Sequence, residues 1–310
     1  GILNEICLKN YHYHGIVFTG NCHSKAYMVK ADIPDKNGSV QLESRVDLGD
    51  GNKNISLEAD LKEFTPYELN LTKKFKGEHF SSHLTADISG TNLDKLNGNI
   101  SIDSLIIHND TIDTLYPGNI LITSENEGDE QHVTVDSPIL SLRADGNFRW
   151  SCIGKTFTQI ISSYIPGIFS TSTTDRPYQD EVDFTARIQD TTYIKRLAGI
   201  QLNIPQSSVI QGQIDGSQRF LNINAQIPSM TYGSEHLQNV QWRIESSHQY
   251  LQTSMVMDRL MKGKPVEMGV DAYTRNNQIM ANMHWDNHRQ PSQKGEIGLT
   301  GELTKDETGN

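Results

Sequence analysis

Three pairs of histidines are the residues of this sequence whose spacing could support chemistry. They are His79 and His83, His12 and His14, and His284 and His288. Two histidines four positions apart on a helix can bind a metal ion, but no HExxH motif surrounds any of these pairs. His12 and His14 share a strand face without an acidic or cysteine partner close in sequence. We interpret all three pairs as surface histidines and expect no metal site.

The motifs of other active sites are also missing from the sequence. It holds no GxSxG elbow, GxGxxG loop or Walker-type loop, and its acidic residues are scattered over the polar positions of predicted strands. The three cysteines, Cys7, Cys22 and Cys152, are odd in number and widely spaced, so they indicate neither a disulfide framework nor a zinc site. We therefore expect no catalytic residues, no cofactor and no enzymatic activity.

The clearest structural pattern lies between Ser208 and Ser246, where apolar residues occupy every second position. Successive side chains of a strand point to opposite faces, so this pattern predicts half-buried antiparallel strands. Pro228 is expected to end one of them. The residues predicted to face the apolar side are Ile210, Ile214, Leu221, Ile223, Ile227, Val240, Trp242 and Ile244.

Most of the remaining chain repeats this alternation. Turns are predicted where Gly, Asn, Asp or Pro interrupt it, among them Gly20-Asn21, Asn97-Gly98 and the stretch 116–119. At Ile153 the period changes to about 3.6 and predicts one amphipathic helix near 153–169, followed by a polar linker over 170–175. The predicted organisation is a first β segment over 1–152, the helix and linker over 153–175, and a second β segment over 176–310.

Composition limits the classes of partner. The 310 residues carry a net charge of −11, which disfavours binding to nucleic acids or to anionic lipid surfaces. No run of 18 apolar residues predicts a transmembrane helix. Because the chain starts with Gly1, we expect a piece of a longer protein.

The number of one-sided strands has a consequence for architecture. Burying one large aliphatic side chain is worth about 1.5–3 kcal/mol, so a dozen apolar strand faces will not stay in water, and one helix cannot cover them. The sheet must curl over on itself, pair with a second sheet or hold an apolar ligand. A long curled sheet would enclose an apolar trough that suits acyl chains.

Several phrases of the sequence resemble the TamB family, the inner-membrane component of the translocation and assembly module, in its Bacteroidota form. ADISGTNLDKLNGNISIDSLII (Ala86–Ile107) is similar to a recurring phrase of that family, and so is DSPILSLRADGNF (Asp136–Phe148) followed by a helix that ends in SSYIPGIF. The 209–240 meander and NNQIMANMHWDN (Asn276–Asn287) also fit. The resemblance covers most of the chain loosely and contains no catalytic signature.

This resemblance implies a non-enzymatic protein of the cell envelope, anchored in the inner membrane and spanning the periplasm. The family, like its AsmA-like relatives, forms a long β-sheet folded like a taco around an apolar groove. Its implied roles are phospholipid transport and outer-membrane biogenesis, including protein assembly and secretion. The implied partners are phospholipid acyl chains and, through parts outside this chain, outer-membrane barrel assembly proteins. The eight residues above would line the groove.

Two other readings follow from the residues. One is a closed β-sandwich or barrel that acts as a surface adhesin or a carbohydrate-binding module, which the richness in Asn, Ser and Thr and the three Trp residues would allow. The other is a β-helical enzyme that processes glycans with a dispersed carboxylate site. Nothing in the spacing of the acidic residues supports this second reading.

Overall fold

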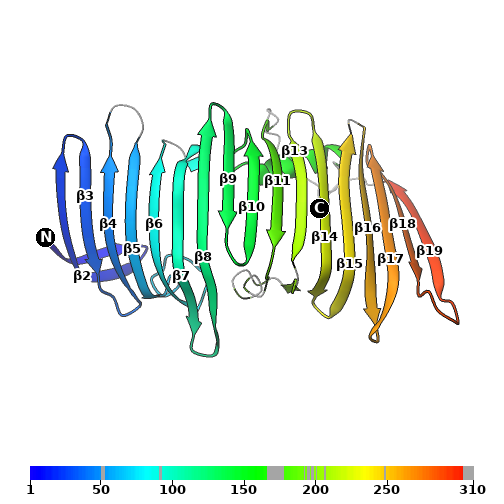
Figure 1. The fold of residues 1–310 in the computed structure, drawn as a ribbon, viewed down its shortest axis with the longest axis horizontal. Coiled ribbons are helices and arrows are strands. Elements are labelled where there is room, and N and C mark those ends of the chain that lie inside the picture. The colour runs from blue at the N-terminus through cyan, green and yellow to red at the C-terminus, as the bar shows by residue number, and fades with distance from the viewer. Residues whose placement is uncertain are drawn as a thin grey trace. The chain divides into compact units, whose positions relative to one another are not determined.

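The computed structural model describes residues 1–49, 53–90, 93–165, 178–191, 193, 196, 199, 201–205, 207–247 and 249–302. The described residues form one 19-stranded antiparallel sheet, in which most strands pair with the next strand along the chain, and one short α-helix (Figure 1). The predicted all-β antiparallel sheet is therefore confirmed, whereas its curling into a groove stays a prediction.

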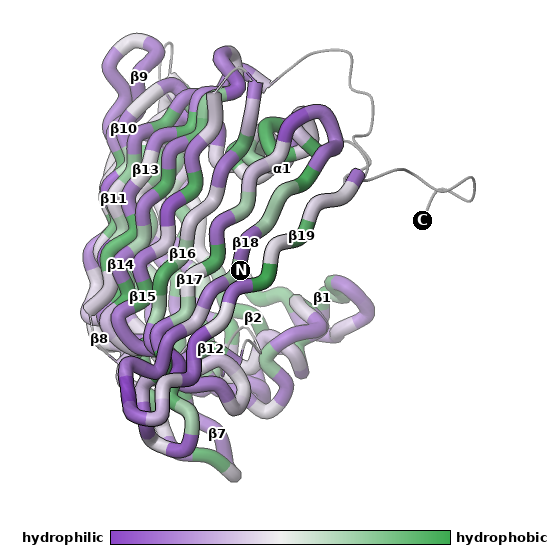
Figure 2. The backbone as a smooth tube through the Cα atoms, turned by 90° about the vertical axis from the view of Figure 1, so that its right-hand side faces the viewer, coloured by the Kyte–Doolittle hydropathy of each residue, from purple (hydrophilic) through white to green (hydrophobic). Residues whose placement is uncertain are grey.

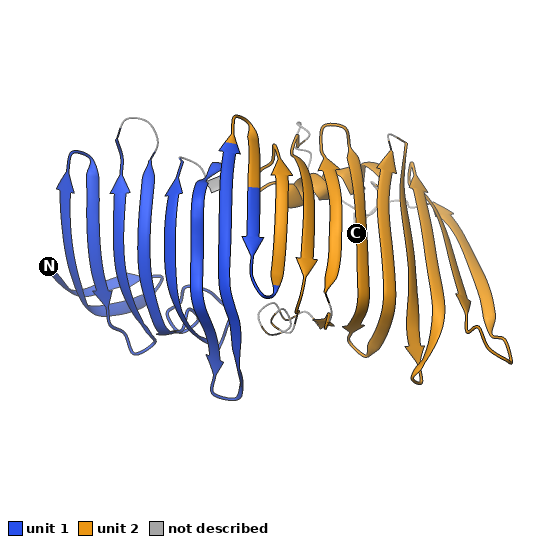
Figure 3. Ribbon diagram, viewed as in Figure 1, with its two compact units in different colours: residues 1–126, 133–139 blue, residues 127–132, 140–310 orange. Residues whose placement is uncertain are grey.

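The chain divides into two compact units (Figure 3). Unit 1 comprises residues 1–126 and 133–139, and unit 2 comprises residues 127–132 and 140–310. The predicted division into segments at 153–175 stays a prediction. The strands that lie largely in unit 1 are β1 (Ile2–Leu8), β2 (Tyr11–His23), β3 (Ala26–Ile33), β4 (Ser39–Asp47), β5 (Asn54–Phe64), β6 (His79–Ser89), β7 (Asn97–Asn109) and β8 (Ile112–Glu127), with a 3-10 turn, η1, at Leu93–Lys95.

Strand β9 (Glu130–Asp136) contributes residues to both units, and the helix and the later strands belong to unit 2. Strand β11 pairs with β13, and the two-residue β12 pairs with β14. The elements of unit 2 are β10 (Leu140–Gly146), α1 (Ile153–Tyr164), β11 (Glu181–Ile188), β12 (Leu202–Asn203), β13 (Ser208–Asp215), β14 (Phe220–Tyr232), β15 (Glu235–Ser247), β16 (Tyr250–Met261), β17 (Lys264–Arg275), β18 (Gln278–Asp286) and β19 (Lys294–Glu302).

Strand register gives each unit an apolar and a polar face, because residues directly opposite each other in paired strands point to the same side. In unit 2, Ile223 lies between Gly212 and Ile244 in one row across the sheet. The neighbouring row contains Asn222 between Gln213 and Glu245 and points the other way. Figure 2 shows the resulting alternation of hydropathy along β14, β15 and β16. We call these two sides the apolar face and the polar face of unit 2.

Several predicted turns are wrong, and each has a packing reason. Strand β2 continues through Gly20-Asn21, because Gly20 pairs with Val29 and the turn comes only after His23. Asn97-Gly98 begins β7 instead of forming a turn. A Cβ on Gly98 would lie 1.9 Å from the carbonyl oxygen of Asp87, so glycine permits the close approach of two strands there.

Two prolines predicted at turns or strand ends lie inside strands. Strand β8 runs through the stretch 116–119, and its pairing with β7 shifts register three times. Strand β14 continues through Pro228, which lies opposite Asn239, where β15 forms a bulge against β16. Pro228 falls between the paired residues Ile227 and Ser229 of the β14–β15 ladder and beyond the end of the β13–β14 pairing at Gln226, so its missing N–H costs little there.

Helix α1 confirms the predicted change of period at Ile153. The structure places its end at Tyr164, and the cap is Ile165, whose N–H bonds to the carbonyl oxygen of Ile161. The predicted continuation to residue 169 and the linker over 170–175 fall on 166–177, outside the described residues.

Candidate functional site

All eight residues predicted to line a groove lie on the apolar face of unit 2. They come from three adjacent strands, β13, β14 and β15, and the register places them in four consecutive rows. They differ in exposure: Leu221 is fully buried, whereas 43% of Trp242 is exposed. Other elements of unit 2 therefore cover some of these residues and leave the others exposed.

Helix α1 covers one end of the apolar face. Its residues Ile160 and Tyr164 are buried, and the Tyr164 hydroxyl lies 2.6 Å from the carbonyl oxygen of Ser247 and 3.0 Å from that of Arg219, to which it donates. These two carbonyls belong to the ends of β15 and of the β13–β14 turn. The apolar-face row at this end is buried accordingly, and it contains Val182, Ile214, Leu221, Ser246, Leu251 and Thr274.

A buried carboxylate anchors the start of α1. Asp180 has a side chain only 2% exposed, and it accepts hydrogen bonds from the backbone N–H, Nε and Nη2 of Arg149 at 2.8, 3.0 and 3.0 Å. The hydroxyl of Thr156, in the first turn of α1, adds a fourth at 2.8 Å. Burial raises the pKa of Asp180, but the bonds from Arg149 and Thr156 outweigh it and hold the pKa below its usual value.

A cluster around Ile204 covers the opposite end of the same face. Ile204, Ile227 and Val240 are buried together, and Met230 and Leu237 pack against them. The backbone N–H of Ile204 donates to the hydroxyl of Thr191, which is itself fully buried. This bond joins two parts of the segment between β11 and β13, and the packing of Ile204 on Ile227 and Val240 holds that segment against the sheet.

Between these two covered ends the apolar face is partly open. Ile210, Ile223 and Ile244 are half-buried there, and Trp242 is the most exposed of the eight. The indole N–H of Trp242 donates to the hydroxyl of Thr253 at 2.8 Å, so its polar atom is satisfied within the sheet. The rest of the ring is an apolar contact surface.

Large side chains are also exposed on this face in the last strands. Ile297 pairs with Met283 and is 57% exposed, and Leu299 pairs with Ala281 and is 60% exposed. In unit 1, the corresponding apolar rows expose Phe18 (42%) and Tyr27 (43%). Large contiguous apolar patches occur at interaction sites, whereas single exposed apolar residues are ordinary.

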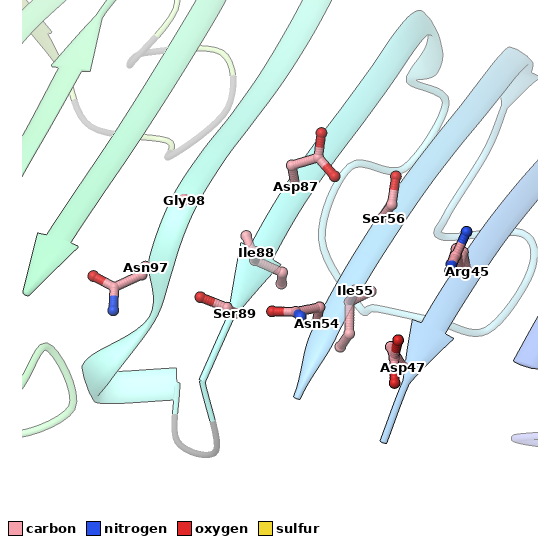
Figure 4. A pocket seen from close by; sticks show the side chains of 10 residues that line it. All are labelled: Arg45, Asp47, Asn54, Ile55, Ser56, Asp87, Ile88, Ser89, Asn97 and Gly98. Atoms are coloured by element: carbon pink, nitrogen blue, oxygen red, sulfur yellow. The ribbon is translucent and has the colours of Figure 1, made fainter. Parts of the chain in front are cut away.

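The polar faces carry shallow hollows and paired charges. In unit 1, a hollow of about 450 Å³ is lined by side chains from β4 to β7 (Figure 4). Its lining contains Arg45, Asp47, Asn54, Ile55, Ser56, Asp87, Ile88, Ser89, Asn97 and Gly98. In unit 2, a second hollow on the polar face is lined by residues that include Arg143, Asp183, Gln213 and Asn222.

Several histidines lie beside carboxylates, most of them on neighbouring strands. Nδ1 of His83 lies 2.8 Å from Asp60, and this hydrogen bond raises the pKa of His83. In unit 2, His132 is equally close to Asp145, which raises the pKa of His132, and Asp145 also accepts from Arg143. No group of three or more His, Cys, Asp or Glu residues that could hold a metal ion occurs among the described residues. His79 lies beside Glu63 and His108, His12 beside Glu5, and His288 beside Glu267 and Asp286.

Sequence reasoning identified the strands of the apolar face and the amphipathic helix α1, but missed Asp180 and the cluster around Ile204. Asp180 is one of three acids in the stretch 180–183 and lies 31 residues from Arg149, and Ile204 follows a segment without alternation. Neither position carries a local signal, because both become important only through contacts distant in sequence.

The part of the chain that the structure describes contains no helix with the length and apolar character needed to cross a membrane.

Comparison of the chain with protein-family models, with curated proteins and with solved structures found no match.

Proposed function

We propose that this chain is a non-enzymatic segment of a cell-envelope protein whose apolar sheet face holds the acyl chains of phospholipids. The observation that carries the proposal is the open middle of the apolar face of unit 2. There Ile210, Ile223, Ile244 and Trp242 lie between α1 and the cluster around Ile204, with no described element fully covering them.

The chemistry of this surface fits an acyl chain better than a polar ligand. The eight predicted residues are aliphatic or aromatic, and the one polar atom among their side chains, the Trp242 N–H, is already bonded to Thr253. A hydrocarbon chain needs no hydrogen bonds, and covering each large side chain contributes about 1.5–3 kcal/mol. Ile297 and Leu299, which are exposed on β19, would extend the contact along the same face.

The resemblance to the TamB family supplies the biological setting of the proposal. In that setting the sheet curls around the apolar face, the protein lies in the periplasm with an inner-membrane anchor, and phospholipids move toward the outer membrane. Docking to outer-membrane barrel assembly proteins would then use parts outside this chain.

Quenching of tryptophan fluorescence tests the proposal at the site itself. A variant with Trp150→Phe and Trp285→Phe leaves Trp242 as the single reporter, and phosphatidylethanolamine with brominated acyl chains serves as the probe. We expect quenching that unbrominated lipid does not cause. Absence of quenching would contradict acyl-chain binding on this face.

A matched pair of variants separates binding from folding. Ile223→Asp places a charge on the apolar face and should weaken quenching, whereas Asn222→Asp makes the same carboxylate on the polar face one position away. We expect Asn222→Asp to bind lipid as the parent does. Equal binding by both variants would refute the placement of the lipid.

A further inference from the structure

The polar face of unit 2 contains a hollow of about 310 Å³ across β16, β17, β18 and β19. Register places two rows of polar-face residues around it. One row contains Gln252, Tyr273, Met280 and Thr300, and the other contains Asp271, Asn282 and Gly298. The hollow lies on the side of the sheet opposite to the proposed acyl-chain surface.

An aromatic platform borders this hollow. The ring of Tyr273 stacks on that of Tyr250, with centroids 5.2 Å apart and planes inclined by 29°. Tyr250 lies one row further toward the strand end, so it takes one face of the Tyr273 ring and leaves the other beside the hollow. An aromatic ring presents an apolar surface held by only two side-chain torsions, which suits the contact of a flat ligand.

Polar groups surround the platform. Asp271 is an acceptor, Gln252 can both donate and accept, and Thr300 carries a hydroxyl. Asn282 donates from Nδ2 to Glu296 at 2.6 Å, which fixes the orientation of its amide. The residues that line this hollow include neither Lys nor Arg, so a phosphate or carboxylate ligand would find no opposite charge.

Glycine creates the space in this hollow. A Cβ built on Gly298 would have no atom within 4 Å, so β19 leaves open volume in front of Asn282, its partner in the register. The hollow of unit 1 in Figure 4 has no aromatic residue in its lining and carries Arg45. An aromatic plane, hydrogen-bonding groups without a basic residue, and open volume therefore coincide at β16–β19.

We propose that this hollow binds a neutral pyranose sugar of a glycan, with the C–H face of the sugar ring stacked on Tyr273. The hydroxyl groups of the sugar then exchange hydrogen bonds with Asp271, Gln252 and Thr300. A sugar both donates and accepts through its hydroxyls, which matches this mixed set, and it has an apolar face for the aromatic ring. The protein would thereby hold a polysaccharide on one face of its sheet, independently of what its other face binds.

Isothermal titration calorimetry with cellotetraose, chitotetraose and mannotetraose tests this site. We expect at least one of the three to bind the intact chain. Tyr273→Ala should weaken that binding at least tenfold, while Tyr273→Phe, which keeps the ring, should stay within threefold of the parent.

Gly298→Trp fills the hollow and should abolish binding. Its control is Gly301→Trp in the same edge strand, because a Cβ on Gly301 also meets nothing within 4 Å but points to the opposite face. We expect Gly301→Trp to bind within twofold of the parent. Absence of binding by all three sugars at millimolar concentration would overturn the proposal, and so would equal binding by Gly298→Trp and Gly301→Trp.

Discussion

Replacing Asp180 tests how α1 is held over the apolar face. Its carboxylate is almost fully buried and accepts four hydrogen bonds from Arg149 and Thr156. Asp180→Asn keeps the shape but removes the charge and places an amide N–H₂ against the guanidinium. Breaking a buried ion pair costs about 3–5 kcal/mol.

Arg149 moderates that cost, because 46% of its side chain is exposed and its guanidinium can regain water. A lost charge-assisted hydrogen bond is worth about 1.5–3 kcal/mol. We therefore expect Asp180→Asn to lower the free energy of unfolding of unit 2 by about 2–3 kcal/mol. Asp183→Asn, at an exposed polar-face position of β11, is the control and should stay within about 0.5 kcal/mol.

Urea unfolding gives the magnitude, and hydrogen–deuterium exchange of the segment 149–164 gives the location. We expect faster exchange there in Asp180→Asn than in the parent. The pH dependence has a defined sign, because the folded pKa of Asp180 is lowered. Its stabilisation is present above the unfolded pKa of about 3.9 and is lost as the pH falls through the folded pKa, so the gap between parent and variant should close in acid. Equal stability of Asp180→Asn and Asp183→Asn would refute the role of Asp180 as the anchor of α1. Unchanged hydrogen–deuterium exchange of the segment 149–164 in Asp180→Asn would refute it as well.

Three further predictions concern stability and titration. Leu221→Ala, at a fully buried position, should cost about 2–5 kcal/mol in urea unfolding, whereas Leu299→Ala, at a 60% exposed position, should cost less than about 1 kcal/mol. Gly98→Ala should destabilise unit 1 by more than about 2 kcal/mol, since φ is +129° and the new Cβ would meet a carbonyl oxygen; a fully stable variant would contradict that geometry. The His83–Asp60 bond raises the pKa of His83, so its stabilisation is present below pH about 6.5 and is lost as the pH rises through the folded pKa; NMR titration should show that pKa fall in Asp60→Asn.

The sequence was sufficient to predict the antiparallel sheet and to assign residues to its two faces. The alternation of apolar and polar residues is a local property of each strand, and the tertiary structure preserves it. Ile223 and Trp242 could be assigned to one face without knowing their partners. The change of period at Ile153 likewise identified α1, since no strand buries residues at i, i+4 and i+7 on one side.

Turn positions were harder to predict, because glycine occurs both in turns and inside strands. At Gly98 it allows a close approach between strands instead of a turn, and at Gly20 it lies within a continuous strand. The actual turn after β2 places Ser24 and Lys25 at positive φ, where Gly or Asn would have been the usual signal.

The hollow at β16–β19 was also invisible in the sequence. Tyr273 and Asn282 belong to different strands, and Gly298 to a third. Their alignment in adjacent rows depends on the register of two strand pairs, and the alternation of apolar and polar residues does not specify that register.

Native mass spectrometry of the purified chain, with lipid extraction in parallel, tests the central claim most directly. The parent should carry phospholipid, Trp242→Glu should lose it, and Gln241→Glu, one position away on the polar face, should keep it. A lipid-free parent chain would contradict the account, as would equal lipid content in the two variants.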